Sequence, residues 1–437
     1  MMFRPSTSFS VCKCKYGRVM RFLLCLWVIA LSGCGFSPDQ IPPDKITSIN
    51  IIDRNGMSET INAKERLNAF GNTDFLSPQP YQKVMRVYGK QSNGDVRSCI
   101  TSYHPNGQVK QLLFSVNNRA FGAYSEWYPN GKLKVEAMVI GGIADINTQA
   151  EQSWLFDGKN CAWDEDGHLI ASIQYEKGEL QGESIYYHPN GQIWKACPYS
   201  KNVLHGSVRI FLEDGSLFQT LSYKEGVKEG ICTRYWERSS IAFQENYEKG
   251  LLMEARYYDW HGSTAATIQR GKGFRAIFGK KQLQQLQEYK GGIQDGSVKI
   301  FDEKNHLTSV YVVHNGEKIG EEINYFPGSK QPKLLLTWHE GVLQGPMKTW
   351  YSSGQLESQR EMSDNQKHGL LSAWYRSGSL MLVEEYDNDN LVKGEYYRMG
   401  EKAPTSQIER GKGIATLFNP EGIFFRKVPY QDGKPLE

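Results

Sequence analysis

The stretch from Gly182 to Gly191, with the sequence GESIYYHPNG, decides the fold of this chain. Proline presets one backbone torsion of a turn, and Asn-Gly supplies the positive φ that a tight return requires. The runs on either side must therefore pair with each other. The stretch predicts the first strand and the tip of a β-hairpin, and the run from Gln192 to Lys195 predicts the return strand.

The same pattern recurs along most of the chain. A glycine, four further residues and an aromatic occur in eleven copies, and three more units keep the aromatic without the glycine. The units follow one another every 24 residues or so. A lone hairpin is marginal in water, whereas stacked hairpins pair each strand on both sides. We expect fourteen landmark aromatics to form the core between units: Tyr103, Trp127, Trp163, Tyr187, Phe211, Tyr235, Tyr258, Phe278, Phe301, Tyr325, Trp350, Trp374, Tyr396 and Phe418.

The predicted fold is all-β, an elongated array of stacked antiparallel β-hairpins with a small N-terminal cap. A longer repeat is superimposed on the short one, because Gln269–Gly273 (QRGKG) recurs 140 residues later as Glu409–Gly413 (ERGKG). This spacing indicates that a block of six units was duplicated. The extra residues around Gly141 to Gln152 predict a surface insertion between two units.

The first 33 residues carry five basic residues and no acidic one, and the apolar run Phe22 to Leu31 lies near their end. Ten apolar residues make a helix of about 15 Å, half the thickness of the hydrocarbon core. This layout predicts a cleaved signal peptide over residues 1–33 rather than a membrane span. A start at Met20 instead of Met1 leaves the prediction unchanged.

The signal peptide ends in Leu31-Ser32-Gly33-Cys34, which resembles the lipobox of bacterial lipoproteins. The resemblance implies that diacylglycerol modifies the Cys34 thiol, that the Gly33–Cys34 bond is cut, and that the new amine is acylated, for example with palmitate. Several acyl chains hold a protein on a membrane that it does not span. Gly35 resembles the sorting pattern for the outer membrane, facing the periplasm or the surface. An ordinary secretory signal with a chance cysteine is the alternative.

After the signal peptide, residues 34–90 predict a tether and cap segment, and residues 91–437 predict the repeat array. Within the cap we expect a strand over Ile46 to Ile52, a turn at Asn55-Gly56 and a short helix over Ala63 to Phe70. The whole chain has a formal charge of +3, and removal of residues 1–33 leaves 46 basic against 48 acidic residues. A nearly neutral mature chain argues against nucleic acid as a partner.

Gly182-Glu183, Tyr187 and Asn190-Gly191, together with Tyr175–Gly178 (YEKG) before them, resemble the bacterial variant of the MORN repeat. The resemblance covers residues 94–437 and implies an all-β repeat array. Some bacterial relatives carry an antitoxin label, and eukaryotic relatives resemble lipid-binding or scaffolding modules. Two tips depart from the pattern, with Ser239 and Asn305 where glycine is expected.

The reactive and metal-binding side chains of the sequence do not form a recognisable catalytic or metal site. Histidines 104 and 188 occupy the same slot of matching tips, so their repeat position explains them. The cysteines after Cys34 are irregularly spaced, which argues against zinc and leaves them structural, free or partly paired: Cys99, Cys161, Cys197 and Cys232. We expect no catalytic residue, no metal, no cofactor and no enzymatic activity.

The aromatic ladder has two interpretations, an inter-unit core or an exposed platform for glycan, peptide or lipid. The platform would require Trp127, Trp350 and Trp374 to line one face with the tyrosine after each pointing outward. The leading functional prediction is a scaffold held on the membrane through Cys34, with a protein partner of unknown identity. The alternatives are an antitoxin-like neutraliser of a partner protein and an envelope glycan- or lipid-binding protein.

Overall fold

The structure is a computed structural model that describes residues 41, 43–70, 73–237 and 240–436. The predicted signal peptide, its Gly33–Cys34 cleavage site and the lipid attachment at Cys34 lie outside the described residues. From Ile41 to Glu437 the chain forms one unit. Within the described part, none of the helices has the length and apolar character needed to cross a membrane.

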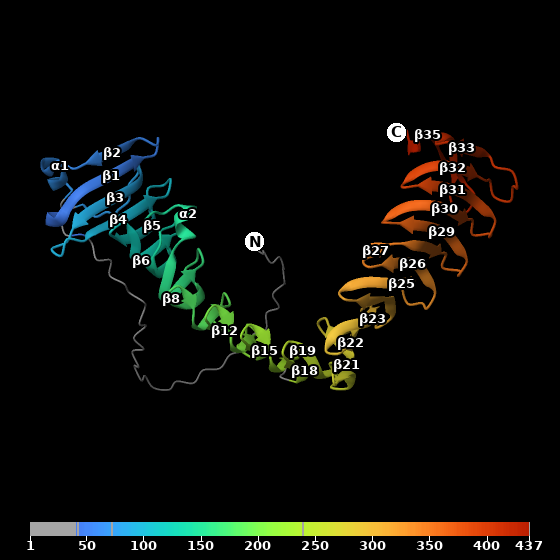
Figure 1. Ribbon diagram of the computed structural model, residues 1–437, viewed down its shortest axis with the longest axis horizontal. Helices are drawn as coiled ribbons and strands as arrows, with labels where there is room; N and C mark the ends of the chain where they lie inside the picture. The colour runs from blue at the N-terminus through green and yellow to red at the C-terminus, as the bar shows by residue number, and fades with distance from the viewer. Residues whose placement is uncertain (1–40, 42, 71–72, 238–239, 437) are drawn as a thin grey trace, which may run out of the picture. The chain divides into compact units, whose positions relative to one another are not determined.

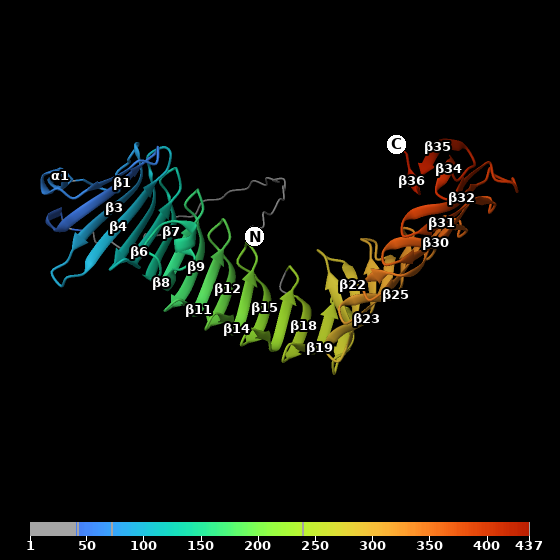
Figure 2. The same ribbon diagram turned by 45° about the horizontal axis from the view of Figure 1, so that its top comes forward.

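The described strands belong to one long, open antiparallel sheet of sequential hairpins, which confirms the predicted all-β fold. Strand β1 lies between β2 and β3, and from β3 onward each long strand pairs with the next long strand along the chain. The two-residue strands β10, β13, β16 and β27 pair only with the strand before them, which then pairs with the strand after them. Figures 1 and 2 show these hairpins side by side in sequence order, with their turns along the two edges of the sheet.

The first part of the sheet contains η1 (Pro43–Lys45), β1 (Ile46–Asp53), β2 (Ser58–Ile61), α1 (Lys64–Asn68), β3 (Gln82–Lys90), β4 (Val96–Tyr103), β5 (Val109–Val116), β6 (Arg119–Trp127), β7 (Leu133–Gly141), α2 (Thr148–Glu151) and β8 (Leu155–Trp163). The middle contains β9 (Leu169–Glu176), β10 (Glu179–Leu180), β11 (Gly182–Tyr187), β12 (Ile193–Ser200), β13 (Val203–Leu204), β14 (Gly206–Phe211), β15 (Leu217–Lys224), β16 (Val227–Lys228), β17 (Gly230–Tyr235), β18 (Ile241–Glu248), β19 (Leu251–Tyr258), β20 (Thr264–Gln269), β21 (Lys272–Phe278) and β22 (Leu283–Lys290). The last part contains β23 (Ile293–Phe301), β24 (Leu307–His314), β25 (Glu317–Tyr325), β26 (Pro332–His339), β27 (Val342–Leu343), β28 (Gly345–Trp350), β29 (Leu356–Ser363), β30 (Gln366–Trp374), β31 (Leu380–Asp387), β32 (Asn390–Tyr396), β33 (Ser406–Glu409), β34 (Lys412–Phe418), β35 (Phe424–Gln431) and β36 (Lys434–Pro435).

Each of the fourteen landmark aromatics is the last residue of the first strand of its hairpin. At thirteen of them the pairing register shifts between the aromatic and the residue before it, as between Tyr186 and Tyr187. A β-bulge of this kind re-aims a side chain. The exception is Tyr396, which pairs with Leu382 and Ser406 without a shift.

The backbone conformation explains why glycine occurs at the landmark positions. All eleven adopt positive φ, between 66° at Gly158 and 148° at Gly413, where a side chain would be strained. At Gly413, and likewise at Gly273, an added Cβ would also collide with a backbone carbonyl oxygen of the preceding strand. The recurrence of QRGKG as ERGKG therefore marks two equivalent close approaches of backbone to backbone.

Side chains join neighbouring hairpins along the tip edge, the edge of the sheet that the hairpin tips form. The residue after a landmark aromatic reaches the backbone oxygen at the corresponding place in the next unit, and we call this contact a tip latch. Tyr128 donates to the oxygen of Trp163 at 2.9 Å. Five further units make a tip latch from a side chain to a backbone oxygen: His104 to Trp127 (2.8 Å), His188 to Phe211 (3.1 Å), Trp236 to Tyr258 (3.3 Å), Tyr351 to Trp374 (2.7 Å) and Tyr375 to Tyr397 (2.6 Å).

The tip latches show that one landmark aromatic was assigned to the wrong residue. Tyr375 reaches Tyr397, just as Trp236, its counterpart in the earlier block, reaches Tyr258. The structural counterpart of Tyr258 is therefore Tyr397, and our assignment of Tyr396 was wrong by one residue. Tyr396 instead corresponds to Tyr257, because the two pair with Leu382 and Phe243 at equivalent places.

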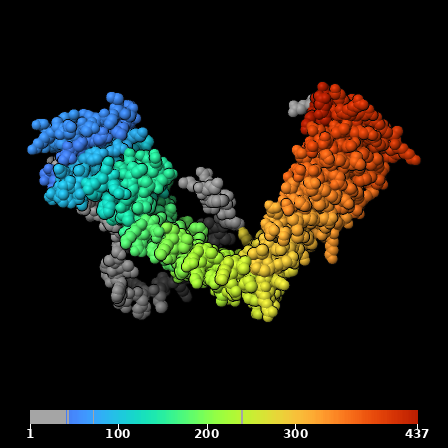
Figure 3. Space-filling view, in the orientation of Figure 1, coloured from blue at the N-terminus to red at the C-terminus, as the bar shows by residue number. Residues whose placement is uncertain are grey.

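Both faces of the sheet are covered near its N-terminal end. The predicted strand, turn and helix of the cap are present, and Leu67 of α1 packs with Ile49 and Met85 on one face. The predicted insertion lies on the other face, where the Trp154 ring is 4.8 Å from that of Tyr124. Figure 3 shows this thicker region in blue to teal and the thinner hairpin array after it in green. Because β3 and β4 pair along their length, the boundary predicted at residue 90 falls inside one sheet.

The two blocks place a buried glutamate at the same position. Glu245 is 1% exposed and accepts hydrogen bonds from Tyr247 (2.9 Å), Tyr257 (2.7 Å) and the Nε of Arg275 (2.8 Å). Although burial alone would lower it, the pKa of Arg275 is raised overall by the Glu245 carboxylate. The counterpart Glu384, 139 residues later, accepts from Tyr386 (3.0 Å) and Tyr396 (2.7 Å), but alanine 415 stands in the place of the arginine.

Candidate functional site

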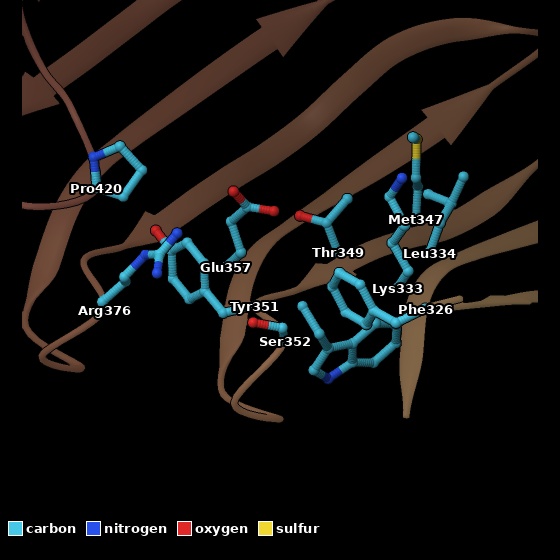
Figure 4. Close-up of a pocket in the computed structure, with 11 residues that line it drawn as sticks. Phe326, Lys333, Leu334, Met347, Thr349, Tyr351, Ser352, Glu357, Arg376 and Pro420 are labelled. Carbon is cyan, nitrogen blue, oxygen red and sulfur yellow. The ribbon is translucent and has the colours of Figure 1, made fainter. Parts of the chain in front are cut away.

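An open groove lies on the sheet between β25 and β31, near the tip edge. Two adjoining hollows of about 460 and 370 Å³ form it, and they share four lining residues: Thr349, Tyr351, Glu357 and Pro420. Figure 4 shows Arg376, Tyr351 and Pro420 at one end and Phe326, Lys333, Leu334 and Met347 at the other. We call this site the repeat groove.

The floor of the repeat groove is a row of short side chains that lie opposite one another on four strands. Thr349 pairs with Leu334 on one side and with Ser358 on the other, and Ser358 pairs with Ala373. Cross-strand partners point to the same face of a sheet. The Thr349 and Ser358 hydroxyls are 2.7 Å apart, so they satisfy each other and leave space above them.

The earlier block has the same row but larger side chains. There the order is Lys195, Ile210, Gln219 and Arg234. The Arg234 guanidinium lies 5.0 Å from the centre of the Phe218 ring, and Phe218 is the counterpart of Glu357. In the later block Ala373 stands at the position of this arginine and contributes only a methyl group to the row.

The tips form the wall at one end of the groove. The Arg376 guanidinium lies 5.3 Å from the ring centre of Tyr351 and 3.2 Å from the Glu421 carboxylate. The backbone N–H of Arg376 also donates to the oxygen of Pro420 at 3.3 Å. This contact joins the last hairpin tip to a tip two hairpins earlier and brings Pro420 to the groove.

The charges of the groove are mostly positive. Lys333, Arg360 and Arg376 line it, with Glu357 as the acidic lining residue. The Nε of Arg360 is buried and has no hydrogen-bond partner within the described part of the chain. Burial and, to a smaller extent, the Glu357 carboxylate raise the pKa of Tyr351, while Arg376 opposes them.

The predicted site residues are placed as follows. Three landmark aromatics are buried (Tyr103, Phe278 and Tyr396) and the other eleven are half-buried at the strand ends. The exposed platform required outward tyrosines, and this condition is not met at Tyr351 and Tyr375, which are 6% and 0% exposed and whose hydroxyls make tip latches. Trp350 does line the repeat groove, as one wall with Tyr351. The four cysteines Cys99, Cys161, Cys197 and Cys232 form no disulfide.

Sequence reasoning missed Glu357, Ala373, Arg376 and Pro420. An alignment of the two duplicated blocks contains the signal, because Ala373 of the later block aligns with Arg234 of the earlier one, and Thr349 aligns with Ile210. What could not be foreseen is that these positions form one row across four strands.

Comparisons with known proteins address the repeat and little else. Three segments, residues 122–139, 180–201 and 343–364, match the family model described as MORN repeat variant. A search of curated proteins gave no match. Among solved structures, a chain of the Photorhabdus luminescens Tc holotoxin pore is 10% identical, with 89% of this chain and 24% of that chain covered and a TM-score of 0.14. A porin-like protein from Bacteroides uniformis is also 10% identical, with 55% and 94% covered and a TM-score of 0.14.

The chain spans about a quarter of the length of the holotoxin chain that it matches, and TM-scores this low carry no argument about shape or activity. The matching segments lie in three separate hairpins, each with its landmark glycine and aromatic in place. The chain thus contains MORN variant repeats within a long open sheet of sequential hairpins.

Proposed function

We propose that this chain is a lipid-anchored scaffold of the bacterial cell envelope that binds a protein partner in the repeat groove. The anchor is Cys34, acylated after cleavage at Gly33–Cys34, and its support is the lipobox-like sequence that follows a short apolar run. The outer membrane is the proposed location, on the basis of Gly35. We propose no catalytic step.

The observation that carries the binding function is the open row Leu334, Thr349, Ser358 and Ala373 beside Trp350 and Tyr351. In the earlier block the end of the same row holds Arg234, whose guanidinium lies 5.0 Å from the ring centre of Phe218. Ring faces, two hydroxyls and charged ends suit an extended segment of a partner, because a few anchors in a pocket carry most of the binding energy of an interface.

The groove is tested with a substitution that fills it. Ala373→Arg reproduces the side chain that the earlier block accommodates at the same position, and Ser372→Arg places the same side chain on the opposite face as the control. A photo-crosslinking residue at the exposed Ser352 position, in cells that express the chain, should give one dominant adduct. The adduct should disappear in Ala373→Arg and remain in Ser372→Arg. An adduct that persists in Ala373→Arg would remove the groove from the binding function.

The anchor is tested separately. Acyl-chain labelling should mark the chain and should be lost in Cys34→Ala, which should also move the chain from the membrane to the soluble fraction. Labelling that survives in Cys34→Ala would contradict the lipid anchor without affecting the groove.

A further inference from the structure

Arg360 of β29 lines the repeat groove with donors that the described protein does not use. It lies two residues beyond Ser358 on the same face of the sheet, and it lines the same hollow of about 370 Å³ as Thr349 and Ser358. Its Nε is buried and has no hydrogen-bond partner among the described residues. Within the described ranges no carboxylate lies within ion-pair distance of Arg360, whereas Arg376 pairs with Glu421 at 3.2 Å.

The acidic residues of this face leave the donors of Arg360 free. Glu384 stands in the same cross-strand row, beyond Leu371, but its carboxylate accepts hydrogen bonds from two tyrosines and does not line the groove. It therefore reduces the positive potential at Arg360 without occupying the guanidinium. Glu357 lines the groove on the tip side of the row, and Lys333 adds a positive charge in the other hollow. The lining charges thus leave room for one further negative charge at Arg360.

The sheet itself does not require an arginine at this position. Strands β14 and β28 each contain six residues, Val208 of β14 pairs with Leu221, and Met347 of β28 pairs with Arg360. The pairing register therefore makes Leu221 the counterpart of Arg360, and Leu221 packs against the buried cluster of the earlier block. The cross-strand neighbours of Arg360 are apolar as well, namely Met347 and Leu371. Packing of the repeat thus explains an apolar side chain here but not a guanidinium.

We propose that Arg360 binds the carboxylate of an aspartate or glutamate side chain in an extended segment of the partner protein. This assignment rests on the proposed binding of a partner in the repeat groove and names the chemistry of one anchor. A guanidinium presents parallel N–H donors that match the two oxygens of a carboxylate. The Thr349 and Ser358 hydroxyls are 2.7 Å apart and use one of their two hydrogens for the bond between them, so the other hydrogen can donate to a ligand in the same hollow.

The length and lining of the groove suit a short stretch of extended chain. The row from Leu334 to Ala373 crosses four strands, and a spacing of about 4.8 Å between strands makes it roughly 14 Å long, the length of about four extended residues. Large apolar side chains provide contacts for the neighbours of the acidic residue: Met347, Trp350, Met381 and Phe418. The Glu357 carboxylate on the same wall would repel a group with two negative charges, which favours a carboxylate over a phosphate.

The experiment selects binders from a displayed library of random short peptides on the purified full-length mature chain. Each round discards the peptides that also bind Ala373→Arg, so that only sequences that need the open groove are kept. We expect an aspartate or glutamate to be enriched at one position, with apolar residues beside it. A selected peptide, synthesised with both termini blocked, should bind in a fluorescence polarisation assay. Conversion of its acidic residue to the amide should weaken binding about tenfold.

Variants of Arg360 decide the assignment. Arg360→Leu introduces the residue of the earlier block, so the fold should tolerate it, and it should weaken binding of the selected peptide about tenfold. Arg360→Glu should instead prefer the peptide in which lysine replaces the acidic residue. Gln359→Leu alters the opposite face of β29 and should leave the affinity unchanged.

The outcomes separate the carboxylate assignment from the groove itself. Selected peptides without an enriched acidic residue, or equal affinity in Arg360→Leu and the unaltered chain, would overturn the role of Arg360 and leave the groove as a binding site. If no peptide distinguishes the unaltered chain from Ala373→Arg, both the groove and its anchor are contradicted.

Discussion

The hydroxyl of Tyr351 donates a hydrogen bond of 2.7 Å to the backbone oxygen of Trp374, and so connects one hairpin tip to the next. The same kind of contact is made by a tyrosine, a histidine or a tryptophan in other units. A carbonyl oxygen can only accept, so each of these side chains must act as the donor. Histidine can therefore replace tyrosine in this position without a role in catalysis.

Tyr351→Phe should destabilise the array by about 1–2 kcal/mol, because it leaves the half-buried oxygen of Trp374 without its donor. Chemical denaturation followed by circular dichroism measures the loss. Tyr325→Phe is the control, because Tyr325 is also half-buried but its hydroxyl has no protein partner among the described residues. Equal destabilisation by the two variants would contradict the tip latch.

Glu245→Gln should destabilise the chain by about 3 kcal/mol, because it removes the buried carboxylate that pairs with the half-buried Arg275 guanidinium. In an Arg275→Ala background the same change should have less than half of this effect. The background reproduces Ala415 of the later block, where two tyrosine hydroxyls alone support Glu384. Denaturation of the four members of this mutant cycle gives the coupling, and additive effects would show that the ion pair contributes nothing.

Stability should fall in alkaline solution. Burial, with a smaller effect of Tyr351, raises the pKa of Tyr375 to about 12, whereas an unfolded tyrosine titrates near pH 10. Above pH 10 the unfolded chain therefore loses a proton that the folded chain keeps, and the contribution of Tyr375 is lost as the pH rises from about 10 through about 12. Tyr375→Phe should flatten the dependence of the unfolding midpoint on pH in this window. An unchanged slope would contradict the burial of this hydroxyl.

The Cys99 thiol should react slowly in the folded chain. Burial raises its pKa to about 11, against a lowering by the hydrogen bond with Thr101. Only the thiolate is a nucleophile, so alkylation at pH 8 should be about a hundredfold slower than in denaturant. Mass spectrometry after iodoacetamide treatment measures this rate, and a cysteine introduced at the exposed Ser377 is the control. Similar rates at the two sites would show that Cys99 is accessible.

Local stereochemistry is the part of the structure that sequence reasoning predicted well. The landmark glycines take positive φ and the Asn-Gly tips return the chain, and both requirements act within a few residues. The confusion of Tyr396 with Tyr397 arose where two tyrosines are adjacent and the landmark glycine is missing, so the pattern could not fix the register. Tip latches were not predicted, because each donor and its acceptor belong to different units.

The repeat groove depends on relations that no single segment contains. Leu334, Thr349, Ser358 and Ala373 come from four strands, and their combined size, rather than the identity of any one of them, leaves the space open. Pro420 reaches the groove only because its tip contacts Arg376 two hairpins earlier. Register across several strands and contacts between tips are long-range properties, whereas the repeat pattern is local.

Pairing only between neighbours has an evolutionary consequence. Strand β14 meets β12 with the register that β11 makes with β9. Unequal recombination that removes residues 182–205 would place β14 directly beside β9, with the same partners and the same turn chemistry. The number of hairpins can thus change by whole units during genome replication, while the distance along the sheet between the cap and any given surface feature lengthens or shortens in fixed steps.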